Sequence, residues 1–148
     1  ELQHVSTSIM EKNEMIESIK KDINYASNFL SDTDSKYLLN PLRSKLDDAT
    51  SGSTDWDEFQ KHFNKSYPGF LENLASINKA LTIPDLRICA YLRSGQTTKE
   101  IAQMTGLSVR SIESRRYRLR KKLNLNRNTP LHKFIYQIEL LKTIPDTA

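Results

Sequence analysis

Apolar residues recur every three or four positions through the first thirty residues of the chain. The a and d positions of this seven-residue repeat hold Leu2, Val5, Ile9, Ile16, Ile19, Ile23 and Leu30, with Lys12 and Ala26 as two weak members. Such spacing places the apolar side chains along one side of a helix. The pattern predicts a long helix over residues 2–30, in either a short coiled coil or a helical bundle.

Three shorter helices are predicted before residue 80. The first, over residues 34–49, contains Pro41, which we expect to kink the helix or to mark a first turn. A Ser/Gly/Thr connection follows at 51–54, and Thr54 or Asp55 is suited to cap the second helix. The aromatic residues of that helix recur three and four apart on one face: Trp56, Phe59 and Phe63.

The third of these helices begins at Pro68. Its buried side is expected to hold Phe70, Leu71, Leu74 and Ile77. No alternation typical of strands occurs along the sequence. Residues 1–80 therefore read as an all-α scaffold with a structural role.

Start and stop signals change at Leu81 and predict four more helices over residues 81–148. The signals are Thr82, Pro84 and Asp85 at the first start and Gly95 at its end, a Thr97–Glu100 capping box and Gly106, Ser108 as the third N-cap, and Pro130 before the last helix. Two short helices joined by Gly106, Leu107 and Ser108 match a helix-turn-helix. In that motif Ala102 allows close crossing and Leu107 is expected to plug the corner.

The second helix of this pair is strongly cationic. Residues 110–123 carry seven Lys or Arg side chains and one acid, Glu113. At about 100° per residue, the apolar stripe comprises Ile112, Leu119, Leu123 and Val109. The opposite face, with Arg118 at its flank, comprises Arg110, Glu113, Ser114, Tyr117 and Lys121. These side chains can pair with base edges in the major groove, so the pattern favours DNA recognition over a merely solvated face.

Charge divides the chain in the same place. Residues 1–80 hold nine Lys/Arg and thirteen Asp/Glu, whereas residues 81–148 hold thirteen and five. A basic segment beside an acidic remainder is typical of a nucleic-acid module joined to another unit. The three histidines lack metal-ligand spacing, and no Gly-rich phosphate loop occurs. We therefore expect no enzyme, no metal and no cofactor, and the single cysteine, Cys89, is expected in the core.

The segment "LTIPDLRICAYLRSGQTTKEIAQMTGLSVRSIESRRYRLRKKLNL" resembles the LuxR/GerE family of bacterial helix-turn-helix regulators. The resemblance implies four helices, with the third in the major groove of double-stranded DNA. By position it implies base reading by Glu113, Ser114 and Tyr117. It implies phosphate contacts by Thr98, Lys99, Ser111 and Lys122, to which the flanking Arg118 is added. The family's last helix commonly forms a dimer contact, for which the candidates are Leu131, Phe134, Ile135 and Ile138.

One departure from the family concerns the doubled arginine, Arg115 and Arg116. The family usually has histidine followed by an apolar residue there, and Arg116 falls inside the expected apolar stripe. A cation in that place needs a partner. We predict a structural ion pair between Arg116 and Glu100 of the preceding helix.

The N-terminal part resembles the cytoplasmic ends of large bacterial sensor-regulators, in the order "IMEKNEMI", "DWDEFQKHFNKSYPGFLENL" and "LTIPDLRICAYLRSG". In those proteins a β-propeller region, one membrane span and a helical linker precede the DNA-binding domain. The resemblance implies that Glu1 follows a membrane anchor and that the chain is a cytoplasmic output part. The heptads would then form a homodimer contact through Val5, Ile9 and Ile16.

Two alternatives remain open. A coiled-coil adaptor could use the basic end to bind an acidic partner or an anionic membrane. A sigma-factor-like region shares the helix-turn-helix and the "KEIA" helix, although the scaffold around Trp56 and Phe59 lends it no support.

Overall fold

The structure is a computed structural model that describes residues 1–50 and 53–141. Its described residues are almost entirely helical and contain no strand, which confirms the predicted all-α fold. The predicted connection at 51–54 lies partly outside the described residues. Thr54 and Asp55, which were expected to cap the next helix, lie within α4 (Ser53–Ser66), so that prediction is wrong. No helix in the described part of the chain is long and apolar enough to cross a membrane.

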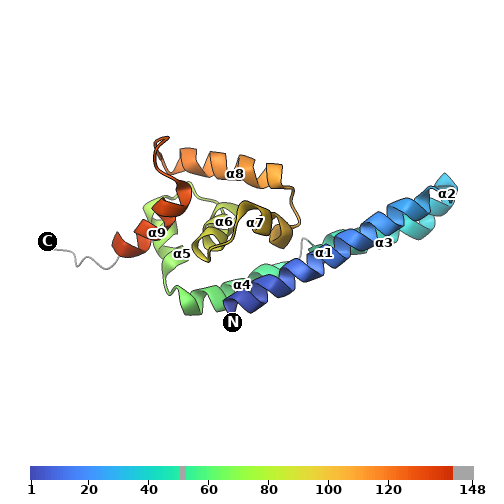
Figure 1. Ribbon diagram of the computed structural model, residues 1–148, viewed down its shortest axis with the longest axis horizontal. Coiled ribbons are helices and arrows are strands. Elements are labelled where there is room, and N and C mark those ends of the chain that lie inside the picture. The colour runs from blue at the N-terminus through green and yellow to red at the C-terminus, as the bar shows by residue number, and fades with distance from the viewer. Residues whose placement is uncertain (51–52, 142–148) are drawn as a thin grey trace.

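A helical hairpin forms the N-terminal part and projects away from the rest of the molecule (Figure 1). Helix α1 (Leu2–Ser27) runs antiparallel to α3 (Asn40–Thr50), and α2 (Asp32–Asp34) and the π-helical turn η1 (Ser35–Leu39) join them. The Asn40 N–H donates to the Ser35 carbonyl, five residues back, directly before Pro41. Because Pro41 has no N–H to donate, the predicted irregularity takes the form of this π turn.

The heptad positions of α1 serve the bundle rather than a coiled coil between chains. Val5, Ile9 and Ile16 are buried within this one chain, and the first two share a core cluster with Phe59 of α4 (Ser53–Ser66). Their prediction as dimer contacts is therefore wrong, because the same chain already covers them. Ile19, by contrast, stays 40% exposed.

The aromatic stripe of α4 forms the centre of the core. Trp56, Phe59 and Phe63 are buried, and neighbouring rings stack at centroid distances of 5.9 Å. Helix α5 (Phe70–Ile77) starts two residues later than predicted, because Pro68 lies in the preceding turn and Gly69, with φ of +75°, is left-handed. Phe70, Leu71 and Leu74 are buried as predicted. Ile77 was predicted on the buried side but is 52% exposed, because it is the last residue of the helix.

Helices α6 (Ile83–Arg93), α7 (Thr98–Thr105), α8 (Val109–Lys122) and α9 (Leu131–Leu141) follow. The N-cap roles of Thr82, Thr97 and Ser108 are confirmed, the first two within capping boxes. One continuous core contains Phe63 and Leu74 as well as Ile88 and Ile112. This core includes residues from both sides of position 80. The predicted division into two domains at residue 80 therefore stays a prediction.

The apolar face of α9 packs into this core and is not available to a partner chain. Leu131, Ile135 and Ile138 are at most 2% exposed, so their prediction as dimer contacts is wrong for the same reason as in α1. Phe134 is half-buried against the core. The guanidinium of Arg93 lies over the rings of Tyr67 and Tyr136, at 4.3 and 4.7 Å from their centroids, and so ties α6 to the scaffold and to α9.

Candidate nucleic-acid interface

A short turn directs α8 across α7. Gly106 ends α7 with φ of +71°, a left-handed conformation that suits glycine. Two residues later, the Ser108 hydroxyl accepts the N–H of Ser111 at 3.1 Å and starts α8. This arrangement of two crossing helices is the helix-turn-helix that the spacing predicted.

The apolar stripe of α8 is narrower than predicted. Ile112 and Leu119 are fully buried, and Leu123 is half-buried. Val109 is 42% exposed and Leu107 37% exposed, so their predicted burial is wrong. Both residues border a groove of about 700 Å³ between α1 and the turn. At its first residues α8 does not yet pack against α7, so these side chains remain exposed.

The opposite face of α8 is open to solvent along its length. Its exposed side chains are Arg110, Ser111, Glu113, Ser114, Tyr117, Arg118 and Lys121. A surface hollow of about 510 Å³ lies among five of them. The Lys121 ammonium lies 4.6 Å from the centroid of the Tyr117 ring, so these two side chains form one unit on the face. All five predicted base-reading residues therefore share one accessible surface.

Arg116 does turn inward, but towards a different partner. Its Nη1 donates to the Thr98 hydroxyl at 2.6 Å. The Glu100 carboxylate instead accepts the Thr97 N–H at 3.1 Å, because Glu100 completes the capping box of α7. The predicted Arg116–Glu100 pair is wrong for this reason. Burial, with a smaller contribution from the nearby Arg120 cation, lowers the pKa of Arg116.

The predicted phosphate residues divide into free and engaged groups. Lys99, Ser111 and Arg118 are exposed, whereas Thr98 accepts from Arg116. Lys122 forms an ion pair with Asp85 at 2.6 Å. This pair joins the end of α8 to the start of α6, so the structure gives Lys122 a structural contact that the sequence did not suggest.

Asp85 has an unusual electrostatic setting. Burial alone would raise the pKa of its carboxyl group, but hydrogen bonds from Lys122 and from Thr82 outweigh burial and hold the pKa below its ordinary value. Arg120 is also structural, because it donates to the carbonyls of Asn126 and Thr129 at 2.7 Å each. Not every cation of α8 is therefore available to a ligand.

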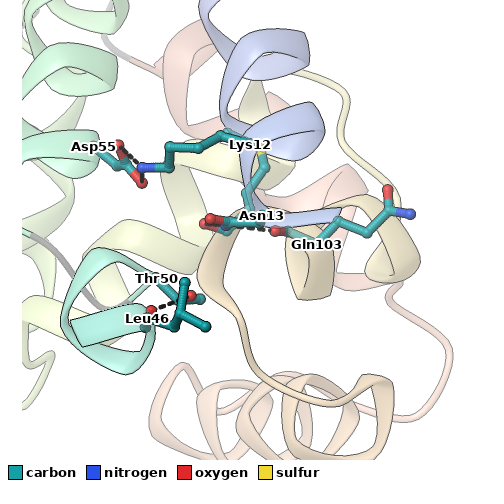
Figure 2. A network of polar contacts seen from close by, with 7 residues as sticks. Lys12, Asn13, Leu46, Thr50, Asp55 and Gln103 are labelled. Atoms are coloured by element: carbon teal, nitrogen blue, oxygen red, sulfur yellow. Dashed lines mark hydrogen bonds and ion pairs between the residues drawn. The ribbon is translucent and has the colours of Figure 1, made fainter. Parts of the chain in front are cut away.

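Contacts from the scaffold hold the turn end of α7 (Figure 2). The Asn13 amide of α1 donates to the carbonyls of Gln103 and Met104, at 2.7 and 3.1 Å. The γ-methyl of Thr50, at the end of α3, lies so close to Gly106 that a Cβ there would stand 2.2 Å from it. Sequence reasoning missed these contacts, since one asparagine and one threonine in amphipathic helices carry no signal of a distant partner. We refer to them together as the turn clasp.

Comparison with known families gives one match: the family described as Sigma-70, region 4, matches residues 91–123. No curated protein and no solved structure matches the chain. The matched segment runs from α6 through the whole of α7 and α8. It is thus centred on the helix-turn-helix, and the matched family belongs to the sigma-factor-like class that the sequence left open as an alternative. The chain contains a helix-turn-helix unit of the DNA-binding, transcription-regulating type.

Proposed function

We propose that the protein is a sequence-specific transcription regulator that inserts α8 into the major groove of double-stranded DNA. The observation that carries the proposal is the open face of α8, where Arg110, Glu113, Ser114, Tyr117 and Lys121 lie together in solvent. Arginine suits guanine, a carboxylate accepts from cytosine, and hydroxyl groups accept or donate. Their shared exposure supports the proposal that these five residues read bases.

Phosphate contacts are proposed for the groups around that face: Lys99, Ser111, Arg118 and Thr98. Arg116 joins them in our proposal. Among the residues that the structure describes, its hydrogen-bond acceptor is the neutral hydroxyl of Thr98, so no hydrogen-bonded carboxylate neutralises its positive charge. That charge lies beside the N-terminus of α7, where a helix already favours an anion. Lys122 contributes less, because Asp85 neutralises it.

The wider setting is also a proposal. The motifs of residues 81–148 support a LuxR/GerE-type regulator, and those of residues 1–80 support the cytoplasmic output part of a membrane-anchored sensor. In that setting the protein acts as a homodimer, because two half-sites read together raise specificity. The match to Sigma-70, region 4, favours a second candidate, in which the same helix-turn-helix serves a sigma-factor-like protein.

Selection of bound sites from a random pool of DNA duplexes tests the function. Two half-sites related by a twofold axis support the dimeric regulator, and a single asymmetric element supports the sigma-factor-like alternative. Binding to vesicles of anionic lipid with no duplex binding supports the adaptor and contradicts DNA recognition. Affinity for duplex is expected to fall with a log–log salt slope of about −0.9 per phosphate neutralised.

Two variants then separate reading from docking. Tyr117→Ala is expected to cost about 1–3 kcal/mol on the selected site and little on random duplex. Lys99→Ala is expected to weaken both duplexes alike, because a phosphate contact carries no sequence information. Lys61→Ala, an exposed lysine on α4, is the matched control and should leave both affinities unchanged. Equal losses for Tyr117→Ala on both duplexes would contradict the assignment of that residue to base reading.

A further inference from the structure

Large apolar side chains stand in solvent along the projecting hairpin. They are Met15, Ile19, Phe29, Leu30, Leu38 and Leu42, and Phe29, Met15 and Leu38 are 72%, 65% and 60% exposed. We call this set the hairpin face. Single exposed apolar residues are common, but a contiguous group of this size marks an interaction site.

Four of these residues, two from each long arm, lie on one side of the hairpin, and Phe29 and Leu30 lie at its tip between α1 and α2. Around the axis of α1, the direction of Met15 and Ile19 is offset by about 70° from that of the buried Ile16 and Ile23, against the sense in which the chain winds. On the α3 side, Leu38 and Leu42 precede the inward-facing Leu39 and Leu46 in the same sense and by a similar angle. Because the two helices are antiparallel, equal rotations of this kind bring both stripes to the same side.

Polar cross-links confirm the geometry from the other side. Lys20 of α1 pairs with Asp47 of α3 at 2.7 Å, and Arg43 donates to the Asn24 side chain at 3.0 Å. These pairs close the edge opposite the hairpin face. The groove beside the turn is likewise bordered by Glu14, Glu17 and Lys21, which lie on a different side of α1 from Met15 and Ile19. The hairpin face is therefore directed away from the helix-turn-helix.

Charge and area on this surface indicate its occupant. Residues 11–50 carry six Lys/Arg and eight Asp/Glu, a balance that an anionic membrane would repel. Asp22 and Lys45, both exposed near these apolar positions, carry opposite charges, which a second copy of the chain could pair across a twofold axis. With large side chains of about 150–250 Å², the six expose on the order of 500 Å², and two copies reach the ~1,000 Å² of a specific interface.

We infer that a second copy of this chain docks on the hairpin face, so that two hairpins form a four-helix bundle with the DNA-binding units outside it. The inference rests on the proposed function for its use, since the bundle would fix the spacing between two α8 helices. It differs from the sequence prediction in its residues, because Val5, Ile9, Ile16, Leu131, Ile135 and Ile138 are already buried. Helix pairs of this kind associate through apolar stripes on neighbouring helices.

Sedimentation equilibrium of the whole chain, without DNA, tests the face. The wild type is expected at twice the chain mass of 17.1 kDa. Ile19→Glu with Leu42→Glu is expected to raise the dimer dissociation constant at least about 100-fold, because burying unpaired carboxylates is unfavourable. Ile83→Glu is the matched control: it exchanges an exposed isoleucine of α6 at a helix start that tolerates an acid, and it should stay dimeric.

Cross-linking keeps the test independent of how well the double variant folds. Cys89 is fully buried, so Leu42→Cys adds one accessible thiol and is expected to give a covalent dimer on oxidation, whereas Ile83→Cys is not. A monomeric wild type, a dimeric double variant or equal cross-linking of both cysteine variants would overturn the inference. Titration with a single half-site separates the two proposals: DNA binding without a dimer refutes only the face, and a dimer without DNA binding refutes only the function.

Discussion

The helix-turn-helix is held at one end and open along one face. At the turn, α1 and α3 reach α7 through Asn13 and Thr50, which are 3% and 8% exposed. Within residues 1–50 and 53–141, the outward face of α8 makes no such contact with the scaffold, and its charged side chains are exposed to solvent. The first region contains uncharged groups fitted closely together, and the second contains cations exposed to solvent.

The difference assigns separate physical roles to the two regions. A fitted contact transmits orientation, because closely packed groups cannot slide without leaving hydrogen-bond acceptors unpaired. A solvated cationic face stabilises the fold little but attracts a polyanion. The direction of the hairpin is therefore tied to the position of the turn, while the affinity for DNA is proposed to reside in α8. Changes at the turn clasp should alter stability, and changes on α8 should alter binding.

The largest expected effect is at Gly106. Gly106→Ala is expected to reduce the free energy of unfolding by about 2–4 kcal/mol. Two costs contribute: the strain of a left-handed alanine, and the clash of its Cβ with the Thr50 methyl, 2.2 Å away. Gly95→Ala is the matched control, with φ of +87° and nothing within 4 Å of a new Cβ, and should cost about 1–2 kcal/mol. Urea denaturation of both variants measures the difference.

Thr50→Ser isolates the contact itself. Serine keeps the hydroxyl that donates to Leu46 but removes the methyl, so Gly106→Ala in this background should cost little more than Gly95→Ala. An unchanged penalty would mean that α3 does not press on the turn, and the comparison between a held end and an open face would fail.

Asn13 comes next in size. Asn13→Ala removes the donor to two carbonyls at the end of α7 and is expected to cost about 1–3 kcal/mol, because buried carbonyls lose their partner. Asn24→Ala is the control, since Asn24 bonds Arg43 in solvent and should cost less than about 1 kcal/mol. Thermal unfolding compares the two, and equal shifts would argue against the clasp.

Local features could be predicted from the sequence, whereas contacts between distant segments could not. The caps at Thr82, Thr97 and Ser108 depend on residues within three positions, so their pattern is complete in the sequence. The exposed face of α8 follows from its period. The partner of Arg116 depended instead on a competition for Glu100, which the capping box decided.

The heptads of α1 show the same limit. A repeat of apolar residues states that one side of the helix is covered, and it leaves open whether the same chain or another covers it. The scaffold settled this for Val5 and Ile9, because α4 lies along them. Likewise, Val109 fits the period of the buried stripe, but it lies at the start of α8, before the helix packs against α7, and it is exposed.

A smaller effect is expected from the Asp85–Lys122 pair, which holds the far end of α8. The pKa of Asp85 is lowered in the folded state, so its contribution to stability is present above the unfolded pKa and is lost as pH falls through the lower folded value. Asp85→Asn should cost about 1 kcal/mol at neutral pH and less in acid. Urea denaturation midpoints of the wild type and the variant, at neutral and at acidic pH, measure this loss of stability. A loss that is larger in acid than at neutral pH would contradict the assigned role.

The smallest effect is expected from Lys12, whose ammonium pairs with Asp55 at 2.6 Å one residue before the clasp (Figure 2). The lysine side chain is 42% exposed, so water screens the pair, and Lys12→Gln should cost about 0.5 kcal/mol or less and nothing measurable at high salt. Asn13→Ala should keep its penalty at every salt concentration, because it acts through neutral hydrogen bonds. A salt-independent loss for Lys12→Gln as large as that for Asn13→Ala would show that charge, rather than close fit, holds α1 to the core at this point.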